Sequence, residues 1–199
     1  MKNIFIDCGS NIGWAVNFYT KLYSFENWNY ICIEPNPYCV NVLKENYGSN
    51  ENIQILQFAV SAVKKTANFR FSSRLGEGGT INDFKIEKSV ETVSVNTITI
   101  DELLSLIEPY DKKIIKIDIE GEEFDFMEQM IREKKYKHFS KIVCEFHSDY
   151  MTSRNFYPRQ YEIVEFFRKN NYLIKQISTN QYLFEDDLMQ SIQDTIQAH

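Results

Sequence analysis

Short apolar runs alternate with amphipathic segments along the first third of the chain. Residues 3–8, 29–34 and 53–58 are runs rich in Ile and other apolar residues, a pattern typical of buried strands. Between the first two runs, residues 13–23 place Trp, Ala, Phe and Leu at helical spacing. Pro37 begins a second helix, because proline is tolerated in the first helical turn. The order strand-helix-strand-helix-strand predicts parallel strands with right-handed crossovers.

The pattern changes in the middle of the chain. Residues 67–72 and 90–98 alternate apolar and polar positions, which predicts antiparallel strands. Residues 72–80 lie between them and hold three of the seven glycines, so we expect a mobile loop there. Asp101 is the predicted N-cap of a helix over residues 102–107.

The last third returns to alternating strands and helices. We expect a fourth parallel strand at 113–121, a helix at 122–136, a fifth strand at 141–147, a helix at 160–170, and a hairpin of 172–178 with 181–185 around Thr179 and Asn180. The whole chain predicts an α/β fold, Rossmann-like and doubly wound. We expect one domain over residues 1–187, with residues 67–98 as a β-rich insertion and residues 188–199 as a tail.

Composition narrows the class of protein. The net charge of −6 argues against a large non-specific grip on nucleic acid, which needs a basic surface. No apolar run approaches the roughly 18 residues of a membrane span. Met1–Asn3 lead straight into a strand and leave no room for a signal peptide. The four cysteines form no C-x-x-C pair and read as reduced thiols. We therefore expect a cytoplasmic protein, monomeric or homodimeric.

The turn after the first strand has the features of an adenosine-cofactor site. Gly9 and Gly13 permit a sharp turn, and Asn11 between them tolerates left-handed backbone geometry. The spacing is not the G-x-G-x-x-G of dinucleotide sites. Asp7 adds negative charge, which suits the ammonium group of S-adenosylmethionine better than a pyrophosphate. The alternative is that Asp7 caps the helix or pairs with a buried lysine.

Glu34 ends the second strand, 21 residues after Gly13. A carboxylate at this position can accept both ribose hydroxyls of an adenosine group. Pro35 and Asn36 follow it and share the expected cofactor site.

Charged residues at the ends of the fourth and fifth strands are candidates for the chemistry. Lys116, Asp118 and Glu120 share one strand face, as do Glu145 and His147. We interpret Lys116 with Glu145 as a buried structural pair and expect Asp118, Glu120 and His147 to reach substrate. His147 is the natural general base, because histidine titrates near neutrality. Its alternative is a hydrogen-bonded structural histidine.

The same strand ends raise the question of a metal. Asp118, Glu120, Glu145 and His147 offer oxygen and nitrogen ligands of the kind that suit magnesium or manganese. Paired acids at strand ends are more common as hydrogen-bonding and base groups. The sequence therefore favours a site without a metal.

Several motifs in the same order resemble the FkbM-type methyltransferases, which are class I enzymes dependent on S-adenosylmethionine. The resemblance runs from residue 4 to about residue 147. It rests on Asp7-x-Gly9-x-Asn11-x-Gly13, Ile33-Glu34-Pro35-Asn36-Pro37, the segment 95–104, Lys116-Ile117-Asp118-Ile119-Glu120-Gly121-x-Glu123 and Glu145-Phe146-His147. Glu122 departs from the pattern, since the family often has a small residue there.

The resemblance implies a fold, a reaction and a site. It implies a mostly parallel seven-stranded sheet of order 3-2-1-4-5-7-6 with an antiparallel last strand. It implies S-adenosyl-L-methionine as cofactor and methyl transfer to a hydroxyl of a sugar, a glycan or a natural-product-type small molecule. The implied catalytic residues are Asp118, Glu120 and His147. The expected cofactor-binding residues are Asp7, Cys8, Gly9, Asn11, Gly13, Glu34, Pro35, Asn36, Ala59, Val60 and Asp118.

Two other functions compete with this prediction. One is a nicotinamide-dependent oxidoreductase, which the incomplete glycine pattern and Asp7 weaken. The other is a non-catalytic scaffold that binds S-adenosylmethionine. The Asn/Asp-Pro-Pro-Tyr/Phe signature of nucleic-acid base methylation is absent after the fourth strand. We expect the loops 72–80 and 148–159 to form the acceptor pocket, with Arg154 or Arg159 as a ligand for an acidic group.

Overall fold

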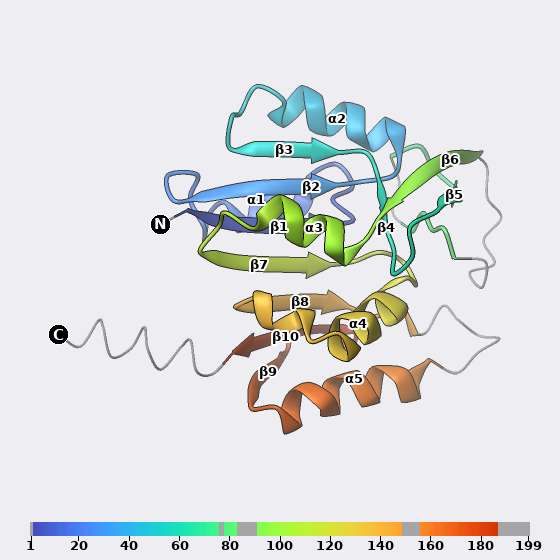
Figure 1. The fold of residues 1–199 in the computed structure, drawn as a ribbon. Helices are drawn as coiled ribbons and strands as arrows, with labels where there is room; N and C mark the ends of the chain where they lie inside the picture. The colour runs from blue at the N-terminus through green and yellow to red at the C-terminus, as the bar shows by residue number, and fades with distance from the viewer. Residues whose placement is uncertain (1, 76–77, 83–90, 149–155, 187–199) are drawn as a thin grey trace.

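A seven-stranded sheet organises the chain in the computed structural model, which describes residues 2–75, 78–82, 91–148 and 156–186 (Figure 1). The strand order is β3-β2-β1-β7-β8-β10-β9, and β10 alone runs opposite to the other six strands, antiparallel to both β8 and β9. Counted within this sheet, the order is the predicted 3-2-1-4-5-7-6, so the predicted fold class is confirmed. The strands are β1 (Asn3–Cys8), β2 (Trp28–Ile33), β3 (Ile53–Leu56), β7 (Lys112–Ile117), β8 (Lys141–Glu145), β9 (Tyr172–Gln176) and β10 (Gln181–Asp186).

Strand periodicity divides the apolar side chains between the two faces of the sheet. The larger core holds Ile4, Ile6 and Cys8 of β1 on one face, packed with apolar residues of three helices. Phe5 and Tyr30 point to the other face, where they pack with Trp28 and Ile114 in a smaller aromatic cluster. The helices are α1 (Trp14–Tyr19), α2 (Pro37–Tyr47), α3 (Ile100–Ile107), α4 (Glu123–Arg132) and α5 (Tyr157–Lys169), with a short 3₁₀ helix η1 (Lys135–His138).

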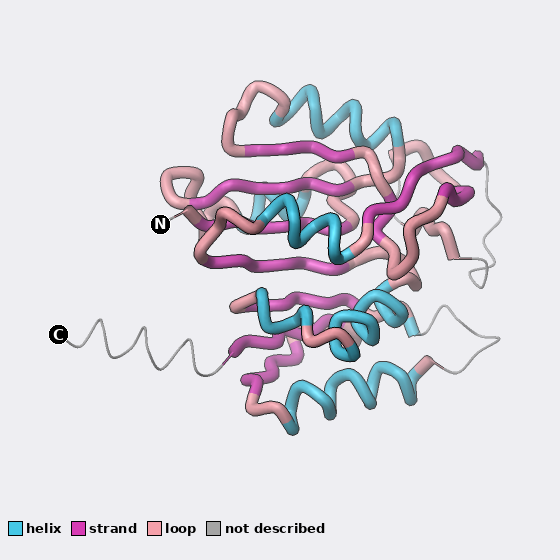
Figure 2. The backbone as a smooth tube through the Cα atoms, viewed as in Figure 1, coloured by secondary structure: helices cyan, strands magenta, loops and turns pink. Residues whose placement is uncertain are grey.

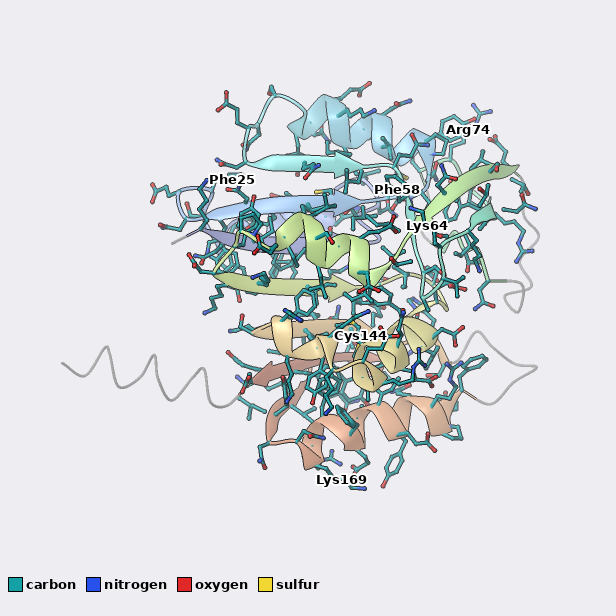
Figure 3. The ribbon with its side chains drawn as sticks, viewed as in Figure 1. Phe25, Phe58, Lys64, Arg74, Cys144 and Lys169 are labelled. Atoms are coloured by element: carbon teal, nitrogen blue, oxygen red, sulfur yellow. The ribbon has the colours of Figure 1, made fainter. Side chains whose placement is uncertain are left out.

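The helices of the second half cover the face with the larger core. The buried apolar residues of α3, α4 and α5 all belong to that core, and Figure 1 shows α1 behind the sheet. The side chain of Cys144, which Figure 3 labels on β8, is fully buried in this layer. The four cysteines are buried free thiols, as predicted.

A second, three-stranded sheet lies beyond the carboxyl ends of β1, β2 and β7 (Figure 2). It consists of β4 (Ala59–Val60), β6 (Glu91–Ile98) and β5 (Thr66–Phe71), in that order. β5 and β6 pair antiparallel, from Thr66 opposite Asn96 to Phe71 opposite Glu91. This confirms the predicted antiparallel strands, and β4 joins the sheet parallel to β6. The small sheet thus stands at the edge where an α/β sheet binds its ligands.

Helix boundaries differ from the sequence prediction at two ends. Asp101 is not the N-cap of α3; Thr99 is, and its hydroxyl and backbone form a capping box with Glu102. The predicted helix 122–136 ends at Arg132, because Lys134 adopts a left-handed backbone (φ 58°) before η1 begins. Capping chemistry and one backbone torsion, rather than the apolar pattern, decide both ends.

The first and last helices also differ from prediction. α1 spans only Trp14–Tyr19 of the predicted 13–23, and α5 begins at Tyr157, three residues before the expected 160. The predicted hairpin is confirmed as β9 and β10. The predicted tail, residues 188–199, lies outside the described residues. Within the described ranges, no helix is both long enough and apolar enough to span a membrane.

Candidate functional site

The turn between β1 and α1 is built around backbone with positive φ. Gly9 has φ 84°, Asn11 has φ 48° and Gly13 has φ 98°. A Cβ at Gly9 would lie 1.8 Å from the carbonyl oxygen of Asp118, so only glycine lets this turn pack against the end of β7. The interpretation of Asn11 as a left-handed residue is confirmed. The turn therefore approaches the ends of β2 and β7 closely.

Glu34 is tied to that turn. Its Oε2 accepts the backbone N–H of Asn11 at 2.8 Å, and its Oε1 accepts the N–H of Asn36 at 2.8 Å. Each carboxylate oxygen keeps a further lone pair for a ligand hydroxyl. Burial raises the pKa of Glu34 to about 7, against the two backbone hydrogen bonds that lower it. Glu34 is thus oriented by the backbone and ready to accept a pair of hydroxyls.

A cavity of about 840 Å³ lies at the carboxyl ends of the parallel strands. Its size is that of a small-molecule site. Asp7, Cys8 and Gly13 do not line it, although the sequence placed them in the cofactor site. The predicted residues that do line it are Gly9, Asn11, Glu34, Pro35, Asn36, Ala59, Val60, Asp118, Glu120 and His147. The fold has brought together these predicted residues from five segments of the chain.

Asp7 has a structural environment rather than an open one. Its side chain is fully buried, and the ammonium of Lys116 lies 3.4 Å from its Oδ1. The Oδ2 of Asp118 accepts a hydrogen bond from the same ammonium at 3.0 Å. The expected pair of Lys116 with Glu145 is therefore wrong, because Lys116 turns toward β1 and the end of its own strand. Of the two interpretations of Asp7, the structure has the buried lysine pair.

Three side chains converge where β7 and β8 end: Asp118, Glu120 and His147, hereafter the strand-end triad. Nε2 of His147 lies 3.4 Å from Oε2 of Glu120 and 3.7 Å from Oδ1 of Asp118. The side chain of His147 is only 7% exposed. The predicted convergence of these three residues is thus what the structure has, and all three line the cavity.

Glu123 orients this histidine, a role that the sequence did not assign. Its fully buried carboxylate accepts the backbone N–H of His147 and of Gly121, each at 2.7 Å, and lies 3.2 Å from Nδ1 of His147. Glu123 belongs to the motif 116–123 and lies in the first turn of a helix. Nothing in the local sequence pattern distinguishes a buried acid at such a position from an exposed one. Only the packing of α4 on the end of β8 identifies it.

The charges around His147 change its acid–base character. Burial by itself lowers the pKa of His147, but the hydrogen bond and charge of Glu123, with the charges of Glu120 and Asp118, raise it to about 9. The prediction that His147 titrates near neutrality is therefore wrong. At neutral pH this imidazole is protonated.

Apolar side chains form one wall of the cavity. Trp14, Phe18 and Leu22, which the sequence placed at helical spacing, are 67%, 58% and 63% exposed and line the cavity. Val16 is the residue of α1 that is buried. Phe58, which Figure 3 labels, lies in the connection from β3 to β4. It also lines the cavity.

The two loops expected to form the acceptor pocket are described only in part. Gly78 to Ile81 line the cavity, and the hydroxyl of Thr80 donates to the carbonyl of Glu120 at 2.7 Å. Arg154 lies outside the described residues. Arg159 belongs to α5 and forms ion pairs with Asp125 and Glu128, so its expected role as an acceptor ligand is not supported.

Comparison with known proteins gives one family match and several proteins of similar structure. Residues 7–174 match a family described as the methyltransferase FkbM domain. No curated protein matches the chain. The solved FkbM methyltransferase of Methylobacillus flagellatus KT is 14% identical with a TM-score of 0.56, over 92% of this chain and 43% of that one. The fibrillarin pre-rRNA processing protein of Methanococcus jannaschii is 11% identical with a TM-score of 0.50, over 92% and 65%.

At these identities, the structural likeness shows a shared fold. The chain spans less than half the length of the Methylobacillus protein and about two thirds of the fibrillarin. The family match, in contrast, covers most of the chain, from the last residues of β1 into β9.

Proposed function

Because the chain belongs to the FkbM family of methyltransferases, we propose that it transfers a methyl group from S-adenosylmethionine to a hydroxyl oxygen of a small molecule. The observation that carries the proposal is Glu34, whose two oxygens are held by the N–H groups of Asn11 and Asn36 beside the cavity. A carboxylate so placed suits the two hydroxyls of a ribose.

The residues present fit this cofactor along its length. Glu34 would hold the ribose, and Phe58, Ala59 and Val60 offer an apolar surface to the adenine. The turn at Gly9 would receive the methionine part against its backbone. When bound, the cofactor supplies an electrophilic methyl group on a sulfonium.

The strand-end triad lies in the same cavity and would face the acceptor hydroxyl. A hydroxyl must lose its proton as its oxygen bonds to the methyl carbon. His147 is already protonated at neutral pH, because its pKa is raised to about 9 by the three neighbouring carboxylates against the effect of burial. The carboxylate oxygens of Asp118 and Glu120, which lie beside His147, can therefore accept a hydrogen bond from the acceptor hydroxyl.

The acceptor is best sought among sugars, glycans and natural-product-type molecules. Trp14 and Phe18 offer exposed rings on the cavity wall, against which a sugar ring can pack. The net charge of −6 opposes a polyanionic acceptor such as nucleic acid. The Methanococcus fibrillarin is named for pre-rRNA processing, but at 11% identity it carries no substrate to this chain.

Two measurements test the proposal. Titration calorimetry should detect binding of S-adenosylmethionine and of its demethylated product, and no comparable binding of NAD. Incubation with S-adenosylmethionine and a panel of sugars and polyhydroxylated small molecules should give products heavier by one methylene, detected by mass spectrometry. Binding of NAD alone would favour the oxidoreductase alternative. Cofactor binding with no transfer to any acceptor, including cell extract, would favour the scaffold.

A further inference from the structure

The strand-end triad has the composition and spacing of a cation site. One oxygen each from Asp118 and Glu120 and one nitrogen from His147 lie within 4.8 Å of one another. Two carboxylates and one imidazole offer both oxygen and nitrogen ligands. This mixed set suits Mn²⁺, and its two carboxylates also suit Mg²⁺. Glu145, which the sequence grouped with them, is not part of this set, and its Oε2 accepts a hydrogen bond from Gln181 at 3.3 Å.

The separations fit neighbouring ligands of one ion. An octahedral ion with ligands at about 2.1 Å places adjacent ligand atoms about 3 Å apart. Nε2 of His147 lies 3.4 Å and 3.7 Å from the two carboxylate oxygens. A good hydrogen bond to a carboxylate is shorter, about 2.7–2.9 Å. Small side-chain shifts would bring the three atoms onto a common ion.

The histidine is held as a metal ligand is held. Glu123 lies outside the triad, and its buried carboxylate fixes Nδ1 of His147 at 3.2 Å, so that Nε2 points to Asp118 and Glu120. Two backbone N–H groups in turn fix Glu123, each at 2.7 Å. A carboxylate on the far nitrogen of a histidine is the usual outer support of a metal site. This support is independent of the triad's own acids.

Asp118 is oriented in the same way. Its Oδ2 accepts from the ammonium of Lys116 at 3.0 Å, while Oδ1 faces His147. Lys116 is itself held by Asp7. One oxygen of the Asp118 carboxylate therefore faces His147 and Glu120, and the other is held by Lys116. A monodentate metal ligand is oriented in this way.

We propose that Asp118, Glu120 and His147 bind a divalent cation, Mn²⁺ or Mg²⁺, which holds the acceptor by two neighbouring oxygens. The inference rests on the proposed methyl transfer and names its acceptor class: a 1,2-diol or a hydroxyl beside a carbonyl. Three protein ligands leave three octahedral positions, and two of them suit such a chelate. The cation lowers the pKa of the acceptor hydroxyl.

The transfer then balances without a protein base. The acceptor hydroxyl gives its proton to water, and its oxygen forms a bond to the methyl carbon. The carbon–sulfur bond breaks, and its electron pair stays on sulfur. The products are a methyl ether, a thioether and a solvated proton.

Binding of Mn²⁺ to the whole chain tests the proposal directly. Protein stripped with EDTA and dialysed should bind one Mn²⁺, seen as loss of the free-ion electron paramagnetic resonance signal, with spin-echo modulation from an imidazole nitrogen. Asp118→Asn, Glu120→Gln and His147→Ala should each weaken the affinity by at least about tenfold. His147→Ala should also abolish the nitrogen modulation.

Glu145→Gln is the matched control, because it removes the same charge from the same cavity outside the triad. Its Mn²⁺ affinity should stay within about twofold of the original. Circular dichroism checks that each variant is folded, and the near-isosteric Asp118→Asn and Glu120→Gln keep the test valid if His147→Ala unfolds. Equal weakening by Glu145→Gln would mean a diffuse charge effect and would overturn the proposal.

Loss of the cation site and loss of the cofactor site give different results. Stripped protein that binds S-adenosylmethionine but no Mn²⁺ overturns the cation site and leaves the proposed function standing. Protein that binds Mn²⁺ through the triad but neither S-adenosylmethionine nor its product overturns the proposed function. If both bind, transfer to a 1,2-diol should require Mn²⁺ or Mg²⁺, and transfer at full rate in EDTA would overturn the cation's role.

Discussion

Glu34 shows how one residue joins the backbone of the first turn to a ligand site. Its oxygens accept N–H groups from both the β1–α1 turn and the start of α2, so the carboxylate stays ordered although it is buried. The sequence predicted its role from its place at a strand end. The sequence could not predict its raised pKa, which arises from burial among Asp7 and Asp118.

Replacement of this carboxylate should weaken cofactor binding. Glu34→Gln removes one acceptor and the charge, so we expect the binding free energy of S-adenosylmethionine to fall by about 1–3 kcal/mol. Titration calorimetry measures it. Glu45→Gln, on the exposed side of α2, is the control and should leave the affinity unchanged. Equal affinity in both variants would remove Glu34 from the site.

The pKa of Glu34 predicts a pH dependence. Its pKa is raised to about 7 by burial, and the ionised form is the better acceptor of ribose hydroxyls. Affinity for S-adenosylmethionine should therefore increase from pH 6 to pH 8. The stability of the free protein has the opposite pH dependence. The folded state holds this proton more tightly than the unfolded chain, so the free energy of unfolding falls as pH rises through 7.

The same variant isolates this titration. Glu34→Gln should flatten the affinity change between pH 6 and pH 8, measured by calorimetry in buffers of constant ionic strength. The unchanged chain supplies the comparison. A pH profile that is identical in both proteins would assign the dependence to another group.

Glu123 governs the state of His147. Glu123→Gln removes the charge beside Nδ1, so the pKa of His147 should fall from about 9, followed by NMR of the imidazole in metal-free protein. Affinity for S-adenosylmethionine should stay the same, whereas turnover should fall by about 10–100-fold. Glu128→Gln, on the same helix, is the control. An unmoved histidine pKa would contradict the role of Glu123.

At the scale of the element, the sequence predicted best those features that depend on neighbouring residues alone. Pro37 at the start of α2, the period-two pattern of β5 and β6, and the β9–β10 hairpin all appear as predicted. The start of α3 was misassigned by two residues, because Asp101 and Thr99 are both good caps and only the reciprocal bond to Glu102 distinguishes them.

The capping box makes a measurable prediction for α3. Thr99→Ala removes the side-chain cap, so the free energy of unfolding should fall by about 1 kcal/mol in urea titrations. Ser105→Ala, whose exposed hydroxyl donates to the carbonyl of Asp101 in the same helix, should change it by less than about 0.5 kcal/mol. A larger loss in Ser105→Ala would contradict this assignment of the cap.

At the scale of the molecule, one cavity joins the main sheet, the small sheet and the wall of α1. Its lining runs from Glu34 and Ala59 to the strand-end triad and to Trp14. Trp14 and Phe18 of α1, and Leu22 after its end, are exposed and line this cavity. Helical spacing alone cannot tell a cavity wall from a core face.

A ligand held by several segments should stabilise the whole fold. At a concentration 100 times its Kd, S-adenosylmethionine should raise the free energy of unfolding by about 2.7 kcal/mol. Urea unfolding with and without the cofactor measures this change, and NAD at the same concentration should have no effect. Stabilisation by NAD instead would contradict the proposed cofactor.

Patterns along the chain were enough to predict the α/β class, the order of elements, the turn at Gly9 and the carboxylate at the end of β2. These depend on periodicity and on backbone preferences of neighbouring residues, which the sequence carries directly. The partner of Lys116, the support of His147 by Glu123 and the exposure of Trp14 depended on tertiary packing. The two contacts join residues that are far apart in the chain or belong to different elements, so they form only when the strand ends come together. The exposure of Trp14 likewise depends on what packs around α1.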